Sequence, residues 1–144
     1  MTNREMSEGL LAQAGEILVE AQELHRRGVW SLVVRRSQEV VELALKAALR
    51  AGGVEVPKIH DVGTTLKGHQ ARFPEHFRKE IDRLASISRR LRHERETSFY
   101  GDEETDAPPQ RLYSEEDAHS ALAEARDVFD LCRTLSRGLG PESG

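Results

Sequence analysis

Hydrophobic residues recur at intervals of three and four along the first part of the chain, which is the spacing of one side of an α-helix. The pattern predicts a helix over residues 4–26, ended by Gly28 after two arginines that suit the negative end of the helix dipole. Its predicted apolar stripe consists of Leu10, Ala14, Ile17, Ala21 and Leu24, with Leu11 and Leu18 beside it.

A second apolar segment begins at Trp30 and ends at the Gly52-Gly53 pair. Its many valines would suit a β-strand, but its period is helical and it is much longer than an ordinary strand. We therefore expect a second helix. The short turn between these two helices predicts that they pack as antiparallel neighbours.

The middle of the chain predicts one short and one long helix. After a loop over residues 53–60, Asp61 is expected to cap the short helix. Pro74 fits the first turn of the longer helix, which should fray near Thr97. The expected core residues of that helix are Phe77, Ile81, Leu84, Ile87 and Leu91.

A polar, acidic stretch from Gly101 to Pro109 predicts a loop before the last helix. Ser114 and Asp117 then have the spacing of a capping box. The predicted inner stripe of the last helix is Ala118, Leu122, Ala125, Val128 or Phe129, Cys132 and Leu135. Together these segments predict an all-α fold, an antiparallel up-and-down helical bundle of four long helices and one short helix. We expect one domain over residues 4–139 and a disordered tail at 140–144.

The composition is that of a globular and highly charged protein, with 38% hydrophobic and 32% charged residues. Aromatic residues make up only 5%, so the core must be mainly aliphatic. The net charge of −4 argues against a surface wholly adapted to nucleic acid, although it allows a local basic patch. No run approaches the roughly 18 apolar residues of a membrane span. We therefore expect no membrane contact and a cytoplasmic location.

Residues that could bind a metal or a cofactor do not form a known motif. The histidines lack the paired spacing on one helix that zinc hydrolases use. The His60-Asp61 pair resembles the ligand doublet of metal-dependent phosphohydrolases, but the other ligands have no counterpart, so capping by Asp61 is favoured. No glycine-rich phosphate loop is present, and Cys132 lies in an apolar stretch that predicts a buried thiol. We predict no metal site and no cofactor.

The most informative polar segment is the arginine-rich run that leads into Ser98-Phe99-Tyr100-Gly101. Guanidinium groups beside an imidazole and an aromatic ring suit phosphate or RNA. The alternative is a solvated helix face with internal ion pairs, which composition alone favours. The candidate contact residues are Arg89, Arg92, His93, Arg95 and Tyr100, and the alternative ion pairs are Arg90 with Glu94 and Arg92 with Glu96.

Arg35 and Arg36 interrupt the otherwise apolar second helix. One interpretation is that they flank a dimer or partner surface. The other is that they pair with Glu39 and Glu42 on the same helix.

Several segments occur in an order and spacing typical of one family. They are Gly28-Val29-Trp30, the second helix up to Gly52-Gly53, Pro57-Lys58-Ile59-His60-Asp61-Val62, Arg95-Glu96-Thr97-Ser98-Phe99-Tyr100-Gly101-Asp102, and Tyr113-Ser114-Glu115-Glu116-Asp117-Ala118 with Ala125 and Val128 after it. Over about residues 5–138 the chain resembles the HEPN domain family. No one of these motifs is highly specific, and the resemblance rests on their combination.

The resemblance implies an all-α bundle that is commonly a homodimer in the prokaryotic cytoplasm. It also implies a partner, a minimal nucleotidyltransferase encoded beside the HEPN protein, and some such pairs act as toxin and antitoxin. Other members of the family are metal-independent ribonucleases with an Arg-x4-6-His signature.

The chain departs from that signature. The nearest pairs, Arg89 with His93 and Arg72 with His76, have only three residues between them. One residue rotates a helical side chain by about 100°, so these pairs are not equivalent to the signature. We therefore predict a non-catalytic module associated with a nucleotide or RNA, the partner of a nucleotidyltransferase. The alternatives are an atypical metal-independent ribonuclease using the Arg89–Arg95 cluster with His93, and a purely structural bundle.

Overall fold

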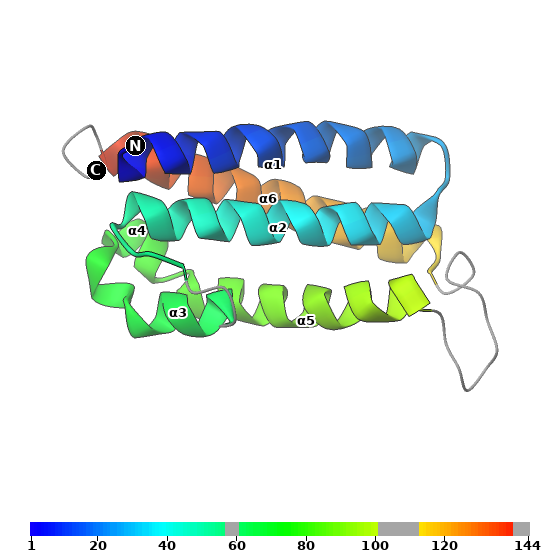
Figure 1. Ribbon diagram of the computed structural model, residues 1–144. Helices are drawn as coiled ribbons and strands as arrows, with labels where there is room; N and C mark the ends of the chain where they lie inside the picture. Colours follow the sequence, from blue (N-terminus) through cyan, green and yellow to red (C-terminus); the bar gives the residue numbers. More distant parts are fainter. Residues whose placement is uncertain (57–60, 101–112, 140–144) are drawn as a thin grey trace.

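Helices form all of the regular secondary structure in the described residues of the computed structural model. These residues are 1–56, 61–100 and 113–139, with only the backbone described over 94–100. Four long helices run along the molecule, and the short elements gather at the end where α1 begins and α6 ends (Figure 1). The elements are α1 (Asn3–Arg26), α2 (Trp30–Ala51), α3 (Val62–Gly68), the 3₁₀ turn η1 (Gln70–Arg72), α4 (Glu75–Arg78), α5 (Ile81–Tyr100) and α6 (Glu115–Leu139).

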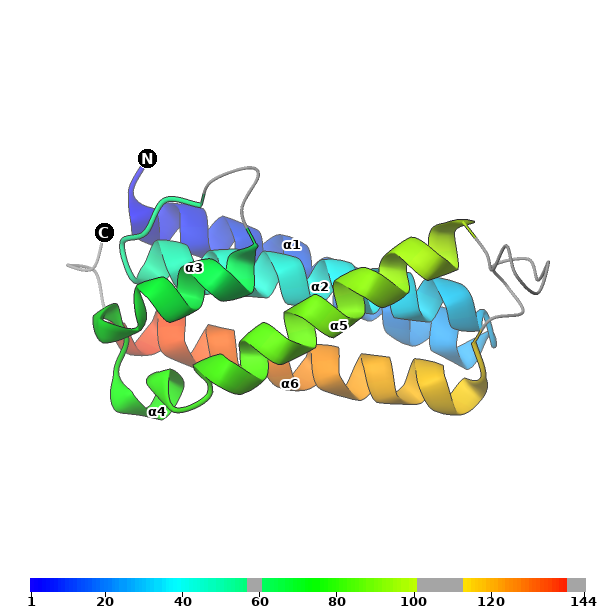
Figure 2. The same ribbon diagram turned by 90° about the horizontal axis from the view of Figure 1, so that it is seen from below.

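The predicted all-α bundle is confirmed, but its division into elements is different. The described residues form six α-helices, because the single helix predicted from Pro74 is broken into α4 and α5. At the break, the N–H of Glu80 donates to the carbonyl of Phe77 over 2.9 Å, a 3₁₀-type bond that interrupts the α-helical pattern. α5 then crosses α2 and α6 obliquely (Figure 2). The five core residues predicted for the single helix are nevertheless all buried.

The ends of α1 and α2 show why glycine follows each helix. Gly28 and Gly53 have φ values of 76° and 79°, a region that residues with a Cβ rarely adopt. Beyond them, Val29 N–H donates to the carbonyl of Leu24 over 3.0 Å, and Val54 N–H donates to that of Leu49 over 2.9 Å. Both ends are therefore Schellman caps. The first cap reverses the chain, so α1 and α2 lie side by side and antiparallel as predicted (Figure 1).

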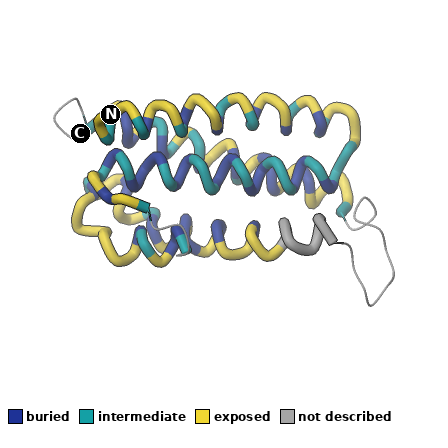
Figure 3. The backbone as a smooth tube through the Cα atoms, viewed as in Figure 1, coloured by how far each residue is buried: buried dark blue, intermediate teal, exposed yellow. Residues whose placement is uncertain are grey.

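α2 lies at the centre of the bundle, packed against α1, α5 and α6. None of its residues is fully exposed, whereas α1 and α6 each have a solvent-facing side (Figure 3). Its contact surface consists largely of alanine and valine, small side chains that allow close approach of neighbouring helices. Even so, none of the described helices is long and apolar enough to cross a membrane.

The buried stripe of α1 is rotated from the one predicted. Leu10 and Ile17 are only partly buried, and the core positions are Leu11 and Leu18 together with the predicted alanines and Leu24. Ser7 extends the stripe because its hydroxyl is satisfied: its Oγ donates to the carbonyl of Ala47 over 2.9 Å. The same oxygen lies 3.2 Å from the Oγ of Ser136, which links α1, α2 and α6.

The predicted helix starts at Asp61 and Ser114 are confirmed. Asp61 Oδ1 accepts a bond from Gly63 N–H over 2.9 Å. Ser114 and Asp117 form the reciprocal capping box, with side chain to backbone distances of 3.1 and 3.0 Å. His60, the stretch Gly101–Pro109 and the tail at 140–144 lie outside the described residues.

Cys132 on α6 is a fully buried thiol, as predicted. Burial, and to a smaller extent the negative charge of Asp127, raise the pKa of this thiol far above its usual value. Of the two alternatives for the inner stripe of α6, Val128 is fully buried while Phe129 is only partly covered.

Candidate nucleic-acid interface

The candidate site lies on α5, one side of which is buried against α2 and α3. Leu84, Ile87 and Leu91 occupy that side, so the charged residues between them must point elsewhere. Their directions divide the arginines of α5 into two groups.

The first group, Arg83 and Arg90, faces α6. Arg83 Nη1 lies 2.8 Å from Asp127 Oδ2, and Arg83 Nε lies 2.8 Å from Glu80 Oε2. The bond to Glu80 first, and then the bond to Asp127, raise the pKa of this arginine. Arg90 pairs with Glu124. The Arg90–Glu94 pair expected from the sequence involves a side chain outside the described ones. These two arginines hold α5 against α6.

The second group is Arg89, Arg92 and His93, all exposed to solvent. Residues three and four apart on a helix are neighbours, so Arg89 lies one turn from both Arg92 and His93. Within the described part of the chain, neither Arg89 nor Arg92 belongs to an ion pair. The structure therefore brings three of the five predicted contact residues together on one outward face, which we call the α5 face.

The other two predicted contact residues are only partly placed. The backbone of α5 continues through Arg95 to Tyr100, past the predicted fraying at Thr97. The side chains of Arg95 and Tyr100 lie outside the described ones, so their part in the α5 face stays a prediction.

The α5 face carries side chains of the kind that bind phosphate. Two guanidinium groups one turn apart can each donate two hydrogen bonds to a phosphate oxygen pair. A catalytic site, by contrast, depends on donors fixed in a region from which water is excluded. Arg89 and His93 are exposed to water, where charge stabilisation is weak.

Arg36 on α2 follows the ion-pair interpretation of the sequence. Its Nη1 lies 2.9 Å from Glu39 Oε2, and its Nε lies 3.3 Å from Glu20 Oε1 on α1. The bond to Glu39 raises the pKa of this arginine. Glu42, expected as a partner of Arg35 or Arg36, has its Oε1 3.3 Å from Lys46 Nζ. Arg36 thus joins α1 to α2.

One cluster had no signal in the sequence pattern. His25 of α1 and His119 of α6 approach each other, with ring centroids 5.7 Å apart, and Trp30 lies 5.4 Å from His25. Because His25 and His119 are far apart in the chain, no local sequence motif predicts their contact. In the described ranges, no three histidine, cysteine or acidic side chains are placed so that they could hold a metal ion.

Comparison with known proteins gives one match. A family model described as "HEPN domain" matches residues 7–135, which is most of the chain and includes the whole described part of the α5 face. No curated protein and no solved structure matches the chain.

Proposed function

Because this chain belongs to the HEPN domain family, we propose that it is a non-catalytic binding module whose α5 face holds phosphate groups of RNA or of a nucleotide. The module would act in the cytoplasm. The family membership supports an RNA- or nucleotide-related role, and the exposed arginines of the α5 face are groups that bind phosphate.

The observation that carries the proposal is the division of the arginines on α5. Arg83 and Arg90 already have carboxylate partners on α6. Arg89 and Arg92 are exposed on the same helix and belong to no ion pair among the described residues. Arg83 and Arg90 are thus occupied in ion pairs with α6, whereas Arg89 and Arg92 present their guanidinium groups to solvent, where a phosphate can reach them.

We extend the proposal to the partners that the family resemblance implies. The chain would form a homodimer and would pair with a minimal nucleotidyltransferase in a toxin–antitoxin-like system. Tyr100 would be the residue that such a transferase reaches, because it ends α5. Incubation of the chain with the neighbouring transferase and ATP, followed by mass spectrometry, tests this part. A Tyr100 that remains unmodified contradicts it.

RNA binding is tested by fluorescence anisotropy with labelled single-stranded RNA across a salt series. We expect affinity to fall steeply with ionic strength, since each phosphate contact adds about 0.7 to the slope of log K against log salt. Replacing both Arg89 and Arg92 with Gln should weaken binding and lower that slope by about 1.4.

The matched control replaces Arg27 and Arg78, two exposed arginines outside α5, with Gln. It changes the net charge equally and should leave the slope nearly unchanged. Equal slopes for the two double variants would mean that binding is a general charge effect and that the α5 face has no role.

The atypical ribonuclease remains a second candidate for one reason, the placement of Arg89 and His93 one turn apart on the same face. The test is cleavage of single-stranded RNA in the presence of a chelator. Cleavage that is lost in His93→Ala supports the ribonuclease. The non-catalytic proposal requires RNA to bind and remain intact.

A further inference from the structure

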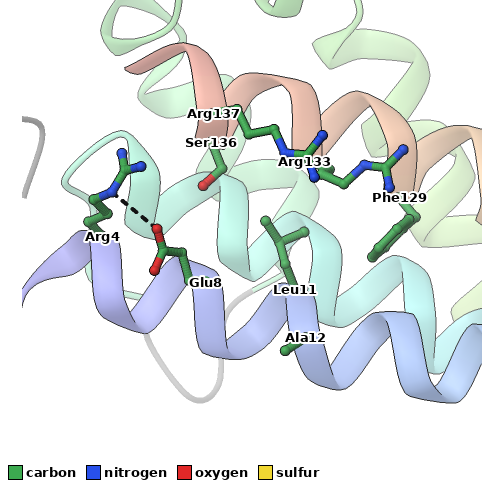
Figure 4. Close-up of a pocket in the computed structure, with 8 residues that line it drawn as sticks. All are labelled: Arg4, Glu8, Leu11, Ala12, Phe129, Arg133, Ser136 and Arg137. Carbon is green, nitrogen blue, oxygen red and sulfur yellow. Dashed lines mark ion pairs between the residues drawn. The ribbon is translucent and has the colours of Figure 1, made fainter. Parts of the chain in front are cut away.

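A pocket lies between the first turns of α1 and the last turns of α6, away from the α5 face. Its volume is about 290 Å³, and its lining includes Arg4, Leu11, Phe129, Arg133, Ser136 and Arg137. Figure 4 shows these side chains on the two helices that form its walls. The volume is just below the range for pockets that hold drug-sized ligands, about 300–1,000 Å³, so only a small ligand would fit.

Ser136, one of the residues that line the pocket, is held in place by buried hydrogen bonds. Ser136 lies 3.2 Å from Ser7, oxygen to oxygen, and Ser7 donates to the carbonyl of Ala47 on α2. Because Ser7 gives its proton to that carbonyl, the Ser136 hydroxyl is the donor between the two serines. Contacts with α1 and α2 therefore fix the position of Ser136 in the pocket wall.

The charge of the lining is positive. Three arginines face one carboxylate, Glu8, whose Oε1 lies 3.1 Å from Arg4 Nε. Arg4 Nη1 is buried and has no hydrogen-bond partner within the described part of the chain. Arg137 is exposed and belongs to no ion pair among the described residues.

The helix ends do not cancel that charge. α1 begins where α6 ends, so the positive end of one dipole lies beside the negative end of the other (Figure 1). Because Arg4 pairs with Glu8 and Arg133 pairs with Asp130, the guanidinium of Arg137 leaves the lining with a net positive charge. An anion in the pocket would complement this positive charge.

The remaining wall is apolar and includes an aromatic ring. Phe129 is partly buried against α1, where a Cβ added to Gly15 would lie 3.4 Å from its Cζ. The guanidinium carbon of Arg133 lies 5.4 Å from the centre of the Phe129 ring, and its Nη2 lies 3.0 Å from Asp130 Oδ1. Leu11 extends the apolar surface. An anion that filled this pocket would need an apolar or flat part.

We infer that the pocket binds a small organic phosphate. Arg4 and Arg137 would donate to the phosphate oxygens, and the apolar part of the ligand would lie against Phe129. The inference does not depend on the α5 face, because the two places share no residue.

Isothermal titration calorimetry of the full chain with phenyl phosphate tests the inference, with phenol and inorganic phosphate as comparison ligands. We expect phenyl phosphate to bind more tightly than either, since only it can use the arginines and the ring together. Replacing Arg137 with Gln should weaken phenyl phosphate about tenfold, the loss expected for one hydrogen bond to a charged group. Arg137 belongs to no ion pair in the part of the chain that the structure describes, so the fold should be unaffected.

The matched control is Arg126→Gln, an exposed arginine of α6 outside the pocket, which should leave phenyl phosphate binding unchanged. Phe129→Leu should weaken phenyl phosphate and leave inorganic phosphate unaffected. Three results would overturn the inference: no saturable binding at millimolar phenyl phosphate, equal losses in the Arg137 and Arg126 variants, or a dimer whose interface covers the pocket. RNA affinity should be unchanged by Arg137→Gln, which separates this test from that of the α5 face.

Discussion

Gly63 on α3 lies so close to α5 that a single added methyl group should push the two helices apart. A Cβ at this position would be 2.9 Å from both Cα and Cβ of Ala85 and 3.3 Å from its carbonyl oxygen. Ordinary carbon–carbon contact is about 3.5–4.0 Å, so α3 and α5 would have to separate by roughly 0.6–1 Å. Part of the obstacle is backbone, which cannot rotate away as a flexible side chain can.

The expected cost follows from two opposing effects. Forcing an extra methyl into a packed contact costs about 1–3 kcal/mol. Replacing a helical glycine by alanine raises the helix propensity and so stabilises the fold by up to about 1 kcal/mol, and by less near a helix end. Gly63→Ala should therefore lower the free energy of unfolding by about 1–2 kcal/mol. For a chain of this length that is a fall in Tm of about 2–8 °C.

Gly68→Ala is the matched control, since it makes the same substitution in the same helix. Nothing lies within 4 Å of a Cβ at that position, so only the gain in helix propensity remains. We expect a Tm between unchanged and about 4 °C higher. Urea unfolding followed by circular dichroism measures both variants. If Gly63→Ala is as stable as the wild type while Gly68→Ala behaves as expected, then α3 does not pack against α5 as tightly as the structure shows.

Two further predictions concern α6. Ser114→Ala removes one half of the capping box and should lower the free energy of unfolding by about 1 kcal/mol, measured by urea unfolding; an unchanged midpoint would contradict the cap. Because burial raises the pKa of Cys132, a thiol reagent should label it only as fast as the protein unfolds. The pKa of the Cys132 thiol is higher in the folded than in the unfolded chain. Its contribution to the free energy of unfolding should therefore be fully present at pH values below the pKa of the unfolded chain, and it should fall as the pH rises above that pKa. Fast labelling of the native chain at neutral pH would show that the thiol is accessible.

The helix ends were predictable because their signals are local. Gly28 supplies a left-handed conformation, and Ser114 with Asp117 forms a cap within four consecutive residues. Such features depend on neighbours in the chain and survive whatever the helix packs against. The burial of Cys132 was predictable for a similar reason, since the period of its helix places it on the apolar stripe.

The break between α4 and α5 had no comparable signal. The residues around Lys79 and Glu80 are compatible with a helix, and the apolar spacing continues from Phe77 to Leu91. The burial of Ser7 on the α1 stripe has no signal in the sequence either, because a hydroxyl is buried only where it finds hydrogen-bond partners. Only the carbonyl of Ala47 and the hydroxyl of Ser136, supplied by two other helices, make its burial acceptable.

The candidate sites also have features that the sequence predicts and features that only the tertiary structure shows. The sequence by itself determined that α5 carries a dense run of arginines, because composition and helical period are properties of consecutive residues. The tertiary structure decided which of them are engaged, because Glu124 and Asp127 come from another helix. It also decided the existence of the pocket, whose walls come from opposite ends of the sequence. Helices follow from short-range hydrogen bonds and periodicity, whereas ion pairs and cavities depend on packing between segments that the chain keeps far apart.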